Sequence, residues 1–118
     1  MATYEETFKL YVETLAGGDV NQTLTTFAED AVFHDEVPTL SNLPALHIIG
    51  KDNIGAALSQ FGSRKFEVEI KTIRDNEMLF DLVAGPGHKF PCKGILYMSD
   101  GLVKLYLIIP NESNIEIL

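Results

Sequence analysis

The strongest constraint on the fold is a change in the spacing of apolar residues between the two halves of the chain. Along Phe66–Thr72 apolar residues alternate with charged ones, the pattern of a strand with one buried side. Apolar runs follow at Met78–Ala84, Phe90–Met98 and Leu102–Ile109, and turn-forming residues separate them. The second half therefore predicts four strands joined by three hairpins.

The first half has helical spacing instead. Thr3 and Glu6 match a capping box. The apolar residues after them recur every three or four positions as far as Gly17-Gly18, which predicts the end of a first helix. Asp19 predicts the start of a second helix, with Phe27 on its buried side.

A short strand and a long loop are predicted next. Ala31–Asp35 is rich in strand-forming residues, and alternation places Phe33 and Asp35 on the same face. The segment Glu36–Ile49 contains prolines and many apolar residues, so we expect a loop that packs onto the body like a binding-site flap.

A third helix is predicted at Gly50–Phe61, with Phe61 on its inner side and Gly62 as its stop. The 118 residues suit one domain. The predicted fold is α+β: three N-terminal helices packed on a curved antiparallel sheet that is mixed at the edge. Because helices cover one face only, we expect a homodimer through the other, with the apolar tail end Ile115–Leu118 as a further docking segment.

Charge and cysteine content narrow the function classes. A net charge of −8 argues against a nucleic-acid partner. Cys92 is the only cysteine, so no internal disulfide is expected. The N-terminus shows no secretory signal and no run approaches a membrane span, so a cytoplasmic protein without a membrane partner is expected.

No cofactor is expected, because Gly85-Pro86-Gly87 is a turn and no glycine-rich phosphate loop follows a strand. No metal site is expected either, since His34, Asp35 and Glu36 are adjacent and successive strand residues face opposite sides. Cys92 lacks a histidine and an acid at motif spacing, which favours a packing role.

Part of the chain, Tyr4 to about Phe61, resembles the cone-shaped nuclear transport factor 2-like proteins, and within them the ketosteroid-isomerase and SnoaL-like polyketide-cyclase branch. The residues that carry the resemblance are Tyr11-Val12, Leu15, Gly18-Asp19, Phe27-Ala28-Glu29-Asp30-Ala31, Asp35, and Gly50 with Ile54. These motifs indicate the fold far better than the activity, because many functions share it.

The resemblance implies that Tyr11 donates a hydrogen bond to a substrate enolate oxygen and that Asp35 moves a proton between carbons. A carboxylate in an apolar cavity gains a higher pKa and becomes a usable base. The isomerases also use a second acid, which belongs near Gly94–Tyr97, where this chain has Ile95 and Leu96.

Three residues are candidates for the missing donor: Tyr97, His47 and His88. Phe33, Phe61 and Tyr97 are the predicted ligand contacts, and the expected ligand is a small apolar or carbonyl-containing molecule.

The residues also permit plainer roles, since Tyr11 shares the apolar stripe of its helix and Asp35 lies at a strand end. Three hypotheses stay open. They are an isomerase or cyclase with Asp35 as base and Tyr11 as oxyanion donor, a non-catalytic ligand-binding protein, and a protein-interaction dimer.

Overall fold

In the computed structural model, residues 3–85 and 87–111 are described. The helices are α1 (Tyr4–Leu15), α2 (Val20–Leu24), the 3-10 helix η1 (Val37–Ser41) and α3 (Lys51–Arg64). The strands are β1 (Phe27–Asp35), β2 (Leu46–Ile49), β3 (Glu67–Arg74), β4 (Glu77–Gly85), β5 (His88–Ser99) and β6 (Leu102–Pro110).

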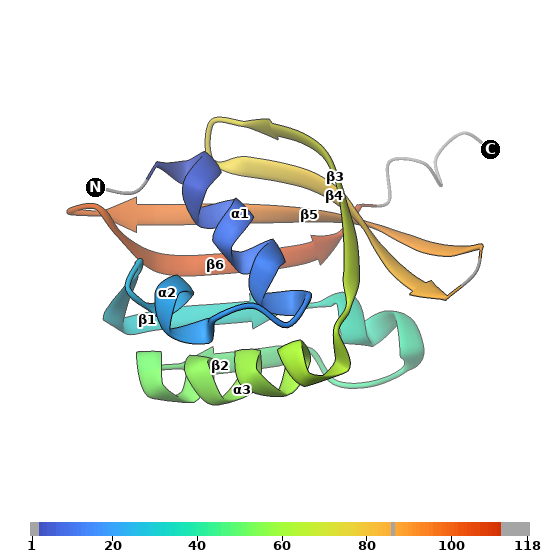
Figure 1. The fold of residues 1–118 in the computed structure, drawn as a ribbon, viewed down its shortest axis with the longest axis horizontal. Coiled ribbons are helices and arrows are strands. Elements are labelled where there is room, and N and C mark those ends of the chain that lie inside the picture. Colours follow the sequence, from blue (N-terminus) through green and yellow to red (C-terminus); the bar gives the residue numbers. More distant parts are fainter. Residues whose placement is uncertain (1–2, 86, 112–118) are drawn as a thin grey trace.

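The strands form one six-stranded sheet in the order β2-β1-β6-β5-β4-β3. The predicted meander is confirmed, since β3 to β6 pair in sequence as antiparallel neighbours. The pair β1 and β6 is parallel, so the mixed pairing lies inside the sheet rather than at its edge. The α-helices lie across one face of the sheet (Figure 1). The α+β class is therefore confirmed.

The position of the third helix differs from the prediction of three N-terminal helices. Strand β2 lies within the segment predicted as a loop and pairs antiparallel with β1, so α3 follows two strands. β2 is a four-residue edge strand, and so short an apolar run carries no period that separates it from a packed loop. Residues 112–118, which include the predicted docking tail, lie outside the described residues.

Two element boundaries also differ. Phe27 was predicted on the second helix but begins β1, where it pairs with Val103 of β6. Gly62 does not end α3 but is one of its residues. It packs against α1, because a Cβ at this position would lie 2.8 Å from the carbonyl oxygen of Thr14. The helix ends instead at Arg64, and the residue that caps it, Lys65, has a left-handed backbone with φ of 53°. Close packing of α3 on α1 thus explains this glycine.

The core lies between the helices and the inner face of the sheet. The capping box at Thr3 and Glu6 is confirmed and starts α1. An aromatic cluster fills the centre of the core and consists of Phe8, Tyr11, Phe33 and Tyr106. No helix in the described ranges is long and apolar enough to cross a membrane.

Candidate functional site

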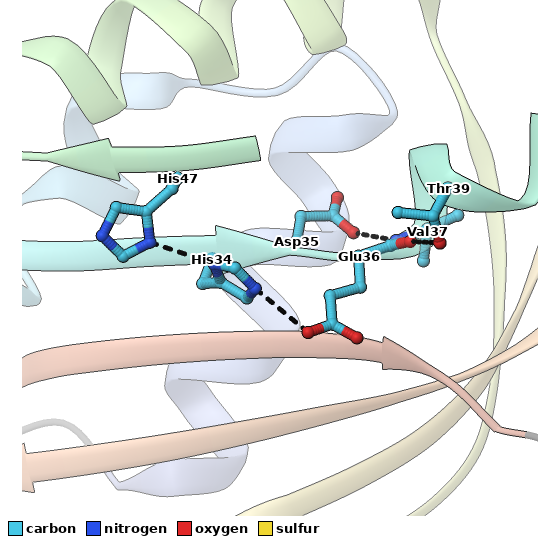
Figure 2. A network of polar contacts seen from close by, with 6 residues as sticks. All are labelled: His34, Asp35, Glu36, Val37, Thr39 and His47. Carbon is cyan, nitrogen blue, oxygen red and sulfur yellow. Dashed lines mark hydrogen bonds and ion pairs between the residues drawn. The ribbon is translucent and has the colours of Figure 1, made fainter. Parts of the chain in front are cut away.

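Alternation along β1 determines which of its side chains meet the core. Phe33 is fully buried, and Asp35 lies two residues further on the same face. Figure 2 shows the carboxyl group of Asp35 on one side of the strand and His34 on the other. The predicted division of β1 into two faces is therefore present.

Asp35 is the last residue of β1, and its side chain bonds to the first residue of η1. Its Oδ1 accepts a hydrogen bond from the backbone N–H of Val37 at 2.9 Å. Glu36, the residue that precedes η1, offers no such side-chain bond. The turn after the strand thus fixes the orientation of the Asp35 carboxyl group.

A cavity of about 290 Å³ opens beside Asp35, near the lower end of the size range for small-molecule sites. Its lining combines residues from the helices and the sheet, among them Tyr11, Asp35, Phe61, Phe80 and Cys92. The predicted flap also contributes through η1 and the residues around it. Tyr11 and Asp35 therefore line the same cavity, from α1 and β1 respectively.

Burial dominates the electrostatics of Asp35. Loss of hydration raises the pKa of Asp35 from its ordinary value of 3.8 to about 6. The N–H of Val37 and the nearby His34 oppose this rise in pKa, and Glu36 adds to it. The carboxyl group can therefore accept and return a proton close to neutral pH.

Tyr11 is buried, and desolvation together with Tyr106 and Asp35 raises the pKa of its hydroxyl well above the usual value. The hydroxyl therefore stays protonated and is able to donate a hydrogen bond. Its ring packs against that of Tyr106 with centroids 4.6 Å apart.

Sequence reasoning missed Tyr106. It is fully buried, and its hydroxyl has no hydrogen-bond partner within the described part of the chain. Gly94 makes room for it, because a Cβ there would lie 3.2 Å from the Tyr106 ring. The register of β1 with β6 places Tyr106 directly beside Phe33. The residue is a second hydroxyl next to Tyr11, although it does not line the cavity.

Two of the three donors proposed from the sequence, Tyr97 and His47, do not line the cavity. Tyr97 is 48% exposed and is absent from the cavity lining, so the ligand contact predicted for it is dropped. His47 lies on β2 opposite His34, on the face of β1 that points away from Asp35 (Figure 2). The side chain of His88 lies outside the described part of the structure.

A polar network occupies the outer side of β1. His34 Nδ1 lies 3.0 Å from His47 Nδ1, and His34 Nε2 lies 3.1 Å from Glu36 Oε2 (Figure 2). Only one of the two Nδ1 atoms can carry the shared proton. Within residues 3–85 and 87–111, no three His, Cys, Asp or Glu side chains are arranged to hold a metal ion.

The predicted ligand contacts Phe33 and Phe61 have different positions. Phe61 lines the cavity, whereas Phe33 lies beneath it and packs against Tyr11 and Tyr106. Cys92 also lines the cavity. Burial raises the pKa of its thiol to about 12, so it remains a neutral group, as an inert packing residue would.

The other missed residue is Arg64, which lines the cavity from the last turn of α3. Its spacing of three residues from Phe61 puts both on one helix face. That spacing could have identified it, had the helix been extended past Gly62.

No protein-family model and no curated protein matches the sequence. Several solved structures share the fold, and all are distant in sequence. A protein from Kribbella flavida is 20% identical with a TM-score of 0.68, and the match covers 98% of this chain and 91% of that one. A nuclear transport factor 2-like protein of unknown function from Mesorhizobium loti is 11% identical with a TM-score of 0.72, covering 92% and 90%.

A third structure comes from Catenulispora acidiphila and is described as a hypothetical protein with a ketosteroid isomerase-like fold, in complex with trimethylamine. It is 15% identical with a TM-score of 0.66, and the match covers 95% of this chain and 89% of that one. Structural similarity at such low sequence identity shows a shared backbone fold and does not show a shared chemistry. The chain therefore has the nuclear transport factor 2-like fold, shared with ketosteroid isomerase-like proteins.

Proposed function

We propose that this protein is a SnoaL-like, ketosteroid isomerase-like enzyme that moves a proton next to the carbonyl of a small apolar molecule. The observation that carries the proposal is the lining of one cavity by both Asp35 and Tyr11. Burial has raised the pKa of Asp35 to about 6, which suits a group that must take up and release a proton near neutral pH.

The steps follow from the two groups. The Asp35 carboxylate removes a proton from the carbon beside the carbonyl, and the electrons of that C–H bond move onto the carbonyl oxygen. The Tyr11 hydroxyl donates a hydrogen bond to the resulting enolate oxygen. Asp35 then returns the proton to the same or another carbon. The mostly apolar lining lowers the local dielectric constant and so strengthens both interactions.

Deuterium exchange tests this reaction without knowledge of the substrate. The protein is incubated in deuterium oxide with a panel of small cyclic ketones and enones, and loss of the proton signal beside the carbonyl is followed by NMR. We expect Asp35→Asn to slow exchange of the reactive ketones by about 10²–10⁴-fold. Tyr11→Phe should reduce the rate as well, because it removes the enolate donor.

Glu36→Gln is the matched control, because it also removes a carboxylate but one that contacts His34 on the outer side of β1. It should change the exchange rate far less than Asp35→Asn does, because the charge of Glu36 is the smallest of the contributions to the pKa of Asp35. Equal exchange rates for Asp35→Asn and the unmodified protein would contradict proton transfer by Asp35.

A non-catalytic binding protein is the second candidate. It is favoured by the residues at the position of the isomerases' second acid, where Leu96 is fully buried and Ile95 is apolar. With Tyr11 as the one tyrosine in the described lining, the oxyanion would have a weak donor set. Saturable binding of ketones without any catalysed exchange would select this candidate. The bound trimethylamine of the Catenulispora protein supports a small-molecule site in this fold under either function.

A homodimer through the outer face of the sheet completes the proposal. Exposed apolar side chains lie on this face, including Ile49 and Tyr97. A second copy packed on this face would bury them. Sedimentation should give a dimer, and Tyr97→Asp should shift the equilibrium toward the monomer. A monomer at all concentrations would contradict this part of the proposal.

A further inference from the structure

Arg64 is the one basic side chain that lines the cavity in the described part of the chain. It is exposed, whereas Tyr11 is buried and Asp35 is partly buried. The guanidinium group therefore lies at the solvent side of the cavity, and the proposed reacting groups lie further inside.

The other basic residues of this acidic chain mostly have partners. Six of the seven lysines lie within 4.0 Å of a carboxylate oxygen. Arg64 makes no ion pair and no side-chain hydrogen bond to any residue in the described ranges. A free guanidinium beside an apolar cavity is suited to bind an anion that the ligand brings.

We propose that the ligand of this cavity is a carboxylic acid, with its apolar body in the cavity and its carboxylate bound by Arg64. This inference rests on the proposed small-molecule site and adds the substrate class. A planar guanidinium matches a carboxylate through two parallel N–H···O bonds. A single guanidinium also balances one negative charge, as a carboxylate carries, rather than the two of a phosphate monoester.

Asp35 determines the orientation of the ligand in the cavity. As a carboxylate it repels a second carboxylate inside the cavity, where water does not screen the charges well. The ligand's acidic end is therefore placed at Arg64 and its other end beside Asp35 and Tyr11. In this arrangement Arg64 selects and orients the ligand, and it takes no part in the proton transfer.

The experiment compares matched acids and amides, so that only the charge differs. Cinnamate and cinnamamide form the first pair, and a set of small aryl and cycloalkyl acids with their amides extends it. Binding to the full chain is measured by NMR titration. We expect the acids to bind about tenfold more tightly than their amides, with the difference shrinking as salt is added.

Arg64→Gln should remove the preference for acids, because it weakens binding of the charged acids far more than binding of the neutral amides. Lys65→Gln is the matched control. Lys65 follows Arg64 and carries the same charge, but its side chain lies over Gly17 and does not line the cavity. Lys65→Gln should change the preference for acids over amides by no more than about twofold, because salt screens an exposed charge that does not contact the ligand.

Each outcome separates the two proposals. If acids and amides bind equally, or if Lys65→Gln has the same effect as Arg64→Gln, the carboxylate inference is wrong and the small-molecule site stands. If no acid and no amide in the set binds, the carboxylate inference is wrong, and the exchange experiment with ketones decides separately whether the small-molecule site stands.

Discussion

Asp35 and His34 are neighbours on β1, yet they meet opposite environments. Asp35 faces a cavity, and burial raises the pKa of its carboxyl group to about 6. His34 faces the outer side, where His47 and Glu36 are its hydrogen-bonding partners. The comparison shows that strand alternation decides which of two neighbouring polar groups is desolvated.

The two faces also differ in what their side chains contribute to stability. Inner residues pack into one aromatic cluster that joins α1 to the sheet through Tyr11, Phe33 and Tyr106. The outer polar contacts around His34 are partly exposed to solvent, so each contributes little. The inner face of β1 therefore contributes much more to the stability of the fold than its outer face does.

The largest difference in stability is expected between truncation of Phe33 and truncation of His34, which are adjacent residues on opposite faces of β1. Phe33→Ala should lower the free energy of unfolding by about 3–5 kcal/mol, because it leaves a void in the core. His34→Ala should lower it by less than about 1 kcal/mol, because it removes partly exposed polar contacts. Urea unfolding at one protein concentration gives both values. Similar losses for the two variants would contradict the division of β1 into two faces.

The next largest effect is the pH dependence that Asp35 gives to the free energy of unfolding. Its pKa is raised in the folded protein, so the native state holds more protons than the unfolded state between the ordinary pKa of 3.8 and about 6. Stability contributed by this group is present below that window and is lost as pH rises through it. Asp35→Asn should therefore unfold with up to about 3 kcal/mol more free energy than the unmodified protein at about pH 8.

Near about pH 4 the same substitution should have almost no effect, because Asp35 is then protonated in the folded protein. Other titrating groups are common to both proteins and cancel in the difference. A gain in stability that is equal at both pH values would show that the carboxyl group is not desolvated.

A smaller effect is expected from single hydroxyl groups. Tyr106→Phe should raise the free energy of unfolding by about 1 kcal/mol, because it removes a buried hydroxyl that has no partner among residues 3–85 and 87–111. Tyr97→Phe removes the same atom from an exposed ring and should change stability by much less than that. Thermal unfolding of both variants makes the comparison. A loss of stability in Tyr106→Phe would mean that its hydroxyl has a partner in solution.

Local patterns in the sequence predicted much of the fold. Alternation predicted β3, apolar runs between turn residues predicted β4 to β6, and the Thr3 capping box predicted the start of α1. β2 was missed because a four-residue edge strand is defined by its pairing with β1 and not by its own period. Phe27 was misplaced for a similar reason, since pairing with Val103 draws it into the sheet.

The candidate site was less accessible from the sequence. Tyr11 and Asp35 were identified by resemblance, and the structure places both on one cavity. Tyr106 was missed because it lies within an apolar strand. The sequence does not show that its hydroxyl is buried and has no hydrogen-bond partner among the described residues. Arg64 was missed because the close contact between Gly62 and Thr14, which lets α3 continue, cannot be inferred from a glycine alone.

The central claim is that Asp35 is a desolvated carboxyl group on a real cavity, and its own titration tests this most directly. Carbon-detected NMR would follow the Asp35 carboxyl carbon across the acidic and neutral range. The structure predicts a pKa of about 6, with a slight further rise in His34→Gln, since the charge of His34 lowers it. A value near the ordinary 3.8, unchanged in the variant, would contradict the account and remove proton transfer as its function.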